Sequence, residues 1–259
     1  MSCNNASDTT YRGENEGAEL DQDGLKAGSS SVSMNETSGD ESTTKTLSYK
    51  SYFCDSSSVF YDPDICTDFS TTRINIIDRS LTSLPKGIFN GLKSLTVLNL
   101  QSNKLTNIKP NTFKNLSNLK DLNISNNVLT SLSQEVFNGL ESLTDLNLES
   151  NELTSLELHI FNNLSNLRRL NINYNSLTSL SQKVFNGLES LILLKLQSNN
   201  LTSLEPNIFK NLSNLKTLDI ANNNLTSLSQ EVFNGLESLG FLALSGSMLK
   251  IINLIYQKR

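Results

Sequence analysis

Few residues of this chain could carry acid–base, nucleophilic or metal chemistry. The sequence has a single histidine, His159, and the last of its three cysteines is Cys66. It contains no glycine-rich phosphate-binding or dinucleotide-binding motif, and no cysteine and histidine group has the spacing of a zinc site. The carboxylates of Asp145 and Glu149 could pair on one surface, but facing carboxylates on a solvated surface are usually not catalytic. We therefore expect no enzyme activity, no cofactor and no metal site.

Binding is the chemistry that the sequence favours. Arginine and tyrosine often dominate the binding energy of protein interfaces, and Arg168, Arg169 and Tyr174 lie close together. Acidic residues precede them and a lysine follows, so opposed charges would orient a partner. The candidate partner-binding residues are Asp121, Asp145, Glu149, Arg168, Arg169, Tyr174 and Lys195. Whether they share one surface depends on the elements that position them.

A strict repeat supplies those elements. Phenylalanine recurs every 24 residues from Phe89 to Phe233. The repeated unit, clearest over 119–142 and 215–238, reads Leu-x-x-Leu-x-Leu-x-x-Asn-x-Leu-Thr-Ser-Leu-x-x-x-x-Phe-x-x-Leu-x-x. A degenerate copy begins at about Thr71 and an incomplete copy begins at Leu239. The full copies between them begin at Leu95, Leu119, Leu143, Leu167, Leu191 and Leu215. The sequence therefore contains about eight units over residues 71–259.

The spacing of the apolar residues predicts how each unit folds. Leucines at positions 4 and 6 alternate with polar residues, which predicts a short strand with one buried face. The remaining leucines and the phenylalanine complete an interior that neighbouring units must cover. The far side of each unit is bulkier than its strand, so the stack should bend with the strands on the concave side. The asparagine at position 9 should bond main-chain groups that the turn leaves unpaired. These structural asparagines are Asn103, Asn127, Asn151, Asn175, Asn199 and Asn223.

The unit resembles the typical 24-residue class of leucine-rich repeats. This class is found in the ectodomains of Toll-like receptors and leucine-rich-repeat G-protein-coupled receptors and in variable lymphocyte receptors. The resemblance covers about Thr71 to Leu249. It implies an α/β fold, namely a right-handed solenoid or horseshoe with a parallel concave β-sheet and a mostly irregular convex side. It also implies binding, usually of a protein on the concave face.

The residues before the repeats have a different composition. Residues 1–50 carry a net charge of −5, equal to that of the whole chain, and are rich in serine and threonine. We predict that they form a disordered acidic tail. Residues 51–70 resemble the N-terminal cap of extracellular leucine-rich repeat proteins, and this resemblance implies a Cys54–Cys66 disulfide. Such caps usually carry four cysteines and this segment offers two, so free thiols remain the alternative.

The compartment and the C-terminal end remain open. The N-terminus lacks a secretory signal, which favours the cytoplasm if the sequence is complete, whereas the resemblance favours an extracellular or cell-surface protein. The apolar residues from Leu249 to Tyr256 could cap the last unit, belong to a fragment of a longer receptor, or enter a membrane. A direct membrane span is disfavoured because Lys250 and Asn253 interrupt a stretch that is too short. An uncapped end would favour a dimer through that end.

Variation among the units suggests where binding occurs. The units alternate between two types, which indicates duplication of a 48-residue block. In one type, outer residues such as Ser133, Asn138 and Gly139 are copied unchanged while the strand positions differ. We interpret this pattern as a concave face diversified for contact, with recent duplication as the competing explanation. Position 5 departs from it, since asparagine recurs there in what we expect to be a solvated ladder. That row is Asn75, Asn99, Asn123, Asn147 and Asn171.

The sequence thus predicts a non-catalytic module that binds a protein on its concave face, in receptor-like or secreted recognition. The alternative is a cytoplasmic scaffold or regulatory subunit. Residues 51–259 have a formal net charge of zero. Because nucleic-acid binding needs a basic face, we expect no nucleic-acid partner.

Overall fold

The computed structural model describes residues 50–53, 57–60 and 70–247. Three features predicted from the sequence lie outside these residues. They are the acidic tail up to residue 49, the Cys54–Cys66 disulfide and the apolar stretch from Leu249 to Tyr256.

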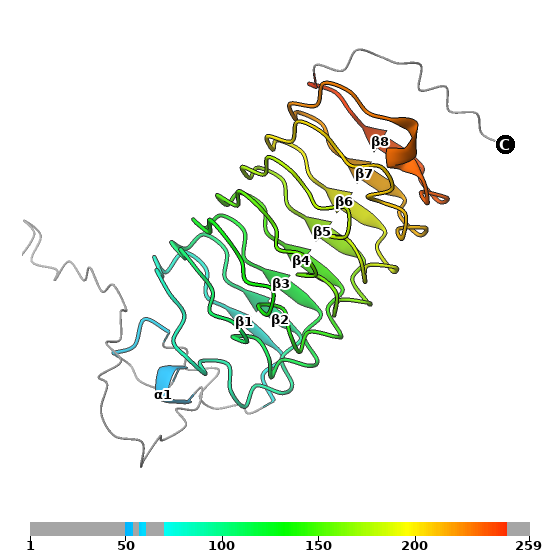
Figure 1. The fold of residues 1–259 in the computed structure, drawn as a ribbon. Helices are drawn as coiled ribbons and strands as arrows, with labels where there is room; N and C mark the ends of the chain where they lie inside the picture. Colours follow the sequence, from blue (N-terminus) through cyan, green and yellow to red (C-terminus); the bar gives the residue numbers. More distant parts are fainter. Residues whose placement is uncertain (1–49, 54–56, 61–69, 248–259) are drawn as a thin grey trace, which may run out of the picture. The chain divides into compact units, whose positions relative to one another are not determined.

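The repeat region is a solenoid whose strands form a single eight-stranded parallel sheet (Figure 1). The order of the strands in the sheet is their order in the sequence. The strands are β1 (Arg73–Asn75), β2 (Val97–Asn99), β3 (Asp121–Asn123), β4 (Asp145–Asn147), β5 (Arg169–Asn171), β6 (Leu193–Lys195), β7 (Thr217–Asp219) and β8 (Phe241–Ala243). Helical structure is limited to the single turn α1 (Lys50–Phe53) and the 3₁₀ turn η1 (Gln230–Phe233) within the described residues. The predicted right-handed leucine-rich repeat solenoid with a parallel concave sheet is confirmed.

Neighbouring strands pair without any shift in register. Each residue lies opposite the residue 24 positions later, so Asp121 pairs with Asp145 and Asp145 with Arg169. The middle residue of every strand from β1 to β7 is buried, and the two flanking residues face outward. A slip of one residue would reverse these faces, so the buried leucines fix the register.

The interior is a continuous apolar core that passes through all full units. It includes the aliphatic residues of each strand and a row of buried phenylalanines on the opposite side. The fully buried members of this row are Phe89, Phe113, Phe137, Phe161, Phe185 and Phe209. The core also includes Tyr52, Phe53 and Phe60 from before the first strand. The hydroxyl of Tyr52 donates to the carbonyl of Lys86 at 3.4 Å.

Two kinds of contact between units alternate along the solenoid. In one kind, phenylalanine rings stack in pairs, as Phe137 does on Phe161 with ring centroids 6.1 Å apart. The same contact carries a hydrogen bond from Asn163 Nδ2 to Asn138 Oδ1 at 3.0 Å. In the other kind, a glycine with positive φ lies against the main chain of the preceding unit, as Gly139 does against Lys114. The 48-residue block seen in the sequence therefore has a structural counterpart.

These contacts change the meaning of the copied outer residues. The sequence interpretation treated Asn138 and Gly139 as surface positions that were free to vary. Asn138 instead accepts a hydrogen bond, and Gly139 has no room for a Cβ atom. Packing between units therefore explains why these two positions are copied, and they no longer support a diversified concave face.

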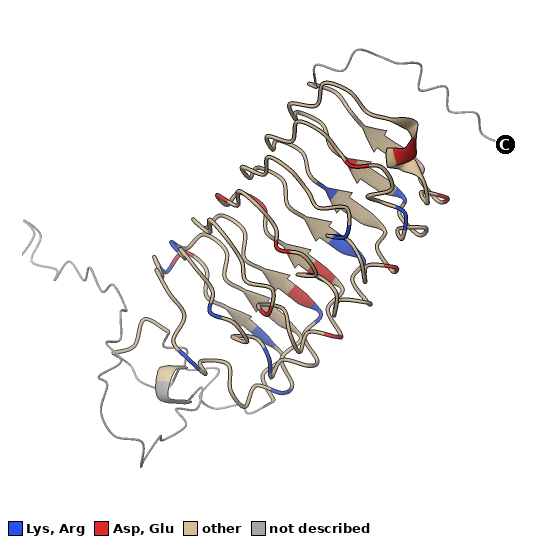
Figure 2. Ribbon diagram, in the orientation of Figure 1, with Lys and Arg blue, Asp and Glu red and all other residues tan. Residues whose placement is uncertain are grey.

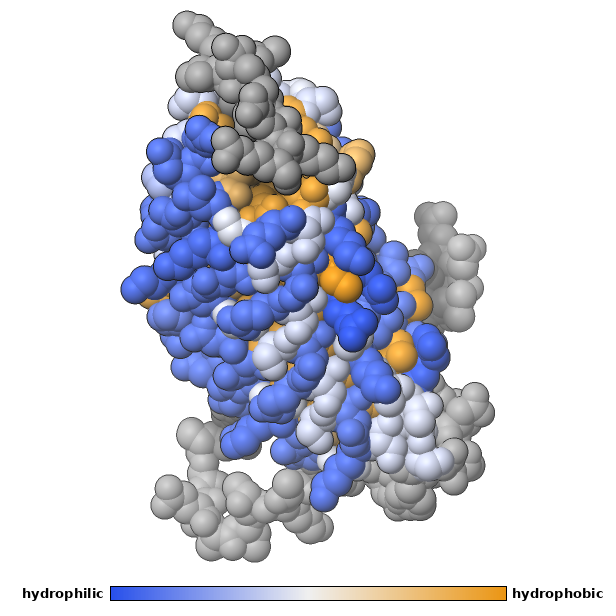
Figure 3. All heavy atoms as spheres, turned by 90° about the vertical axis from the view of Figure 1, so that its right-hand side faces the viewer, coloured by the Kyte–Doolittle hydropathy of each residue, from blue (hydrophilic) through white to orange (hydrophobic). Residues whose placement is uncertain are grey.

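The C-terminal end of the repeat region is packed more loosely than the units before it. Phe233, Leu239, Leu242 and Leu244 are only partly buried, and Phe241 is 56% exposed. The hydrophobic colouring in Figure 3 gathers at this C-terminal end of the repeat region, on a surface that is otherwise mostly hydrophilic.

Candidate functional site

The exposed side of the sheet, which we call the strand face, presents two parallel rows of side chains. The first row contains the first residue of each strand: Arg73, Val97, Asp121, Asp145, Arg169, Leu193, Thr217 and Phe241. The second row contains the third residue of each strand: Asn75, Asn99, Asn123, Asn147, Asn171, Lys195, Asp219 and Ala243. Because the strands are in register, equivalent residues of successive units are direct neighbours across the sheet.

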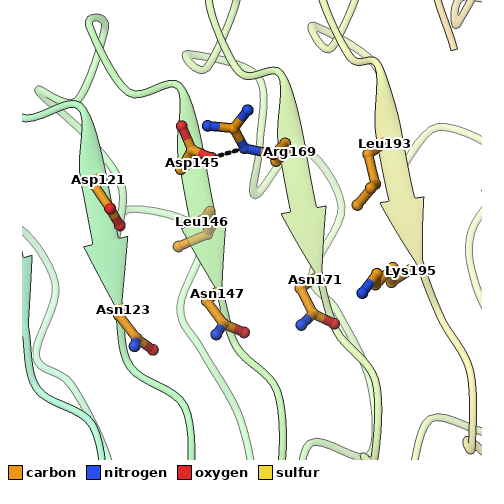
Figure 4. Close-up of a pocket in the computed structure, with 9 residues that line it drawn as sticks. All are labelled: Asp121, Asn123, Asp145, Leu146, Asn147, Arg169, Asn171, Leu193 and Lys195. Carbon is orange, nitrogen blue, oxygen red and sulfur yellow. Dashed lines mark hydrogen bonds and ion pairs between the residues drawn. The ribbon is translucent and has the colours of Figure 1, made fainter. Parts of the chain in front are cut away.

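A groove of about 340 Å³ lies on the strand face between β3 and β6. Four of the seven candidate partner-binding residues line it, namely Asp121, Asp145, Arg169 and Lys195 (Figure 4). The other lining residues are Asn123, Leu146, Asn147, Asn171 and Leu193. Figure 2 shows the resulting change of charge along the sheet, from acidic on β3 and β4 to basic on β5 and β6.

The charged residues of the groove differ in whether another side chain is bonded to them. Arg169 Nε donates to Asp145 Oδ1 in an ion pair, and the Thr144 hydroxyl lies 2.8 Å from Asp145 Oδ2. Among the described residues, no side chain bonds the carboxylate of Asp121. Burial raises the pKa of Asp121, and the neighbouring Asp145 raises it further, while Arg73 and Arg169 act in the opposite direction. The β3 end of the groove therefore holds a negative charge that its surroundings disfavour.

The strands are joined to the following turns by the buried asparagine at position 9 of each unit. Asn127 Nδ2 donates to the carbonyl of Ile124 in its own unit and to that of Leu100 in the preceding unit, both at 3.1 Å. Its Oδ1 accepts the N–H of Leu105 at 3.0 Å. Asn103, Asn151, Asn175, Asn199 and Asn223 repeat this pattern. Each asparagine thus bonds two units through main-chain groups.

Comparison with known families agrees with this architecture. Residues 70–114 and 93–153 match the leucine-rich repeat family, and residues 130–259 match the BspA-type leucine-rich repeat region. The chain belongs to the leucine-rich repeat proteins. No curated protein matches it.

Three solved structures resemble the repeat region. A chain of the TLR13–ssRNA13 complex is 31% identical with a TM-score of 0.66, and the match covers 69% of this chain and 25% of that one. A leucine-rich repeat protein of Leptospira interrogans is 39% identical with a TM-score of 0.59, over 65% of this chain and 41% of that one. A chain of the glycosylated Toll–Spatzle complex from Drosophila is 29% identical with a TM-score of 0.66, over 70% of this chain and 24% of that one. This chain therefore spans less than half the length of each of them.

Three of the candidate partner-binding residues do not line the groove, namely Glu149, Arg168 and Tyr174. Glu149 is adjacent to it, and its Oε2 accepts a hydrogen bond from Asn171 Nδ2 at 2.8 Å. Arg168 precedes β5, is exposed, and accepts the N–H groups of Ile192 and Leu193 on its carbonyl. Tyr174 follows β5 and is 50% exposed. The groove therefore brings Asp121 and Asp145 together with Arg169 and Lys195, and its lining does not include Glu149, Arg168 or Tyr174.

Tyr174 has an unusual backbone conformation. Its φ is +54°, in the left-handed region that large side chains rarely adopt. The equivalent positions of other units also have positive φ but hold smaller residues, such as Ser150, Ser198 and Asn222. An exposed aromatic side chain is therefore held in a strained conformation at the margin of the strand face.

The second-row asparagines have a structural role. Asn147 Oδ1 accepts the N–H of Glu149 at 3.0 Å, two residues later in the chain. Asn99, Asn123, Asn171 and Asp219 accept the equivalent N–H groups of their own units. Lys195 cannot accept a hydrogen bond, and the corresponding N–H of Gln197 bonds instead to Oδ1 of the buried Asn173, at 2.8 Å.

Two residues outside the set of candidate partner-binding residues also matter for this site. Leu193 lines the groove, and the signal for it was an apolar residue at an outward strand position. Asn173, in the preceding unit, accepts the N–H of Gln197, which the side chain of Lys195 cannot accept. Position 7 of other units holds Gln101, Ser125 or Ala221, so no pattern marked Asn173 in advance.

The described residues contain no group of three or more histidine, cysteine, aspartate or glutamate residues that could hold a metal ion. No helix among the described residues is long and apolar enough to span a membrane.

Proposed function

We propose that this chain is a recognition module, receptor-like or secreted, that binds a protein partner on its strand face around the groove between β3 and β6. The leucine-rich repeat solenoid is a protein-interaction fold, and the relatives solved as TLR13–ssRNA13 and Toll–Spatzle complexes support a binding role. The observation that carries the proposal is the groove itself. It gathers Asp121, Asp145, Arg169 and Lys195 from four successive strands.

The charge distribution favours a protein partner over a nucleic acid. The two rows of the strand face contain three basic and three acidic residues. A nucleic acid requires a predominantly basic surface because the phosphates dominate its affinity. A surface with interspersed charges instead matches a protein that presents both signs.

Paired charge-reversal variants test the proposal. The strand-face variant combines Asp121→Lys with Lys195→Glu. The control variant combines Glu141→Lys with Lys183→Glu, which reverses two exposed residues away from the sheet. Both variants keep the net charge of the chain. Their folds are first compared by circular dichroism.

The measurement is affinity capture from cells of the source organism, quantified by mass spectrometry and followed by calorimetry on the purified partner. We expect a protein that the wild type and the control variant retain and that the strand-face variant loses. The strand-face variant should weaken its binding by about 2 kcal/mol or more. Partners that depend on Glu141 and Lys183 but not on Asp121 and Lys195 would place recognition on another surface.

A further inference from the structure

The β3 end of the groove has an unbalanced negative charge. Asp121 and Asp145 lie directly opposite each other on adjacent strands, an arrangement that is unfavourable for like charges. Arg169 pairs with Asp145 from the other side. The guanidinium of Arg169 is therefore bonded to only one of the two carboxylates, and among the described residues Asp121 has no side-chain partner of its own. A cation supplied from outside would relieve this repulsion.

The β6 end of the groove has the opposite imbalance. Lys195 occupies the second-row position that holds asparagine in the five preceding units. No carboxylate of the described residues forms an ion pair with it, and the adjacent Asp219 directs Oδ1 to the N–H of Ala221. Because the side chain of Lys195 cannot accept a hydrogen bond, the N–H of Gln197 bonds Oδ1 of Asn173 instead. An anion supplied from outside would complete this end.

The width of the groove selects the shape of its occupant. The first and second rows are two residues apart along the strands, which is about 6.6 Å. An α-helix with its side chains is about 10 Å across, so it would rest on the rows rather than lie between them. An extended segment is narrower and can run across the strands along the rows, with Leu193 as an apolar contact on one wall.

We propose that the groove holds an extended segment of the partner protein, with a lysine or arginine at Asp121 and Asp145 and an aspartate or glutamate at Lys195. This inference rests on the proposed protein-binding function. Lys195 is two strands from Asp145 and three from Asp121, and it also lies in the other row, so the separations are about 12 to 16 Å at the usual strand spacing and rise per residue. An extended chain advances about 3.3 Å per residue, so the two charges of the partner should be about four or five residues apart.

The ionisation of Asp121 agrees with this assignment. Its pKa is raised because it is partly buried beside Asp145, with Arg73 and Arg169 as the facing positive charges. A bound cation would lower that pKa again. Affinity should therefore fall as the pH decreases through the pKa of Asp121, at a higher pH than for an ordinary aspartate.

A displayed library of random twelve-residue peptides, selected on the full-length chain, tests the inference. Selected peptides are sorted by whether the variant with Asp121→Lys and Lys195→Glu abolishes their binding. We expect the peptides that depend on the strand face to share a basic and an acidic residue about four or five positions apart. A synthetic copy of such a peptide should bind the Asp121→Asn variant of the chain about ten-fold more weakly than it binds the wild type.

Asp219→Asn is the matched control for this substitution. It also removes one negative charge from the strand face, and its amide oxygen can still accept the N–H of Ala221. We expect it to change affinity less than about two-fold, since a screened surface charge contributes little. Equal losses with Asp121→Asn and Asp219→Asn would reduce the effect to general electrostatics and overturn the inference.

Two further outcomes separate this inference from the proposed function. Peptides that depend on the strand face but lack the paired charges would overturn the inference and leave protein binding on this face intact. A selection in which no peptide depends on the strand face, while peptides that depend on Glu141 and Lys183 are recovered, would contradict both.

Discussion

The interior and the strand face belong to the same 24-residue units but follow different rules. In the interior, equivalent positions have equivalent surroundings, so Leu122, Leu146 and Leu170 occur in sequence and all are buried. On the strand face, the neighbouring positions read Asp121, Asp145 and then Arg169. A residue in the interior is fixed by the unit on each side. A residue on the strand face needs only to be tolerated, so it can be chosen for contact with a partner.

The interior and the strand face also differ in how they tolerate substitutions. A changed interior residue meets atoms on all sides, and densely packed interiors relax only partly. A changed strand-face residue meets solvent. It costs stability only where its side chain also serves the main chain, as the second-row asparagines do.

The glycine contacts between units give the largest expected effect. In Gly187→Ala, the new Cβ atom would lie 2.7 Å from the carbonyl oxygen of Asn162, and φ at this position is +89°. We expect a loss of about 2 to 4 kcal/mol, from the strained backbone and the forced separation of two units. Urea unfolding followed by circular dichroism measures it.

Gly240→Ala provides the contrast on the exposed side. Gly240 immediately precedes β8, and an added Cβ atom would have its nearest neighbour, the carbonyl oxygen of Lys216, at 3.7 Å. The unfolding midpoint should change little. Similar losses for the two substitutions would mean that the contact between units is no more constrained than the edge.

Most of the fold can be predicted from the sequence because the same apolar residue types recur at the same buried positions of each unit. A leucine recurs every 24 residues from Leu95 to Leu215, and all six copies are buried in the same way. Repetition of this kind removes the ambiguity of a short apolar segment. The strand register and the parallel sheet follow from the same period.

The strand-face groove is less predictable because it depends on how different residues meet. The period places Asp121, Asp145 and Arg169 in one row, but it cannot say that Arg169 pairs with Asp145 and leaves Asp121 without a side-chain partner among the described residues. Nor does it show that Tyr174, which is close to Arg169 in sequence, lies outside the groove. These outcomes depend on side-chain geometry and on residues that occur once.

A smaller effect is expected where the strand face depends on a buried residue. Asn173→Ala removes the acceptor for the N–H of Gln197, at a cost of about 1 to 3 kcal/mol. In a chain that also carries Lys195→Asn, the new asparagine can accept that N–H as Asn147 accepts the N–H of Glu149. The cost of Asn173→Ala should therefore fall markedly in that background.

A double-mutant cycle of the two substitutions, measured by urea unfolding, gives the coupling energy. We expect about 1 kcal/mol, the usual size for residues that share a hydrogen-bonding group. Additive effects would show that Asn173 stabilises the turn independently of Lys195. The strand face would then be less dependent on the interior than the hydrogen bonds indicate.

The smallest expected effect has the opposite sign. Asp121→Asn removes the repulsion between Asp121 and Asp145, so it should stabilise the chain at neutral pH by about 0.2 to 0.5 kcal/mol, a small value because Asp121 is only partly buried. A raised folded-state pKa means that the favourable contribution of Asp121 is complete below its ordinary value of 3.8 and is lost as the pH rises through the raised value. The variant should therefore be more stable than the wild type at pH 7. This difference in stability should disappear as the pH falls through the raised pKa of Asp121 towards 3.8.

Asp145→Asn is the informative control for this prediction. It removes the same repulsion but also breaks the ion pair with Arg169, so it should give no comparable gain at pH 7. Urea unfolding of both variants between pH 3 and pH 7 measures the difference. If Asp121→Asn were destabilising at neutral pH, Asp121 would contribute to the fold, and the strand face could not be regarded as a surface whose residues are chosen for a partner at the expense of stability.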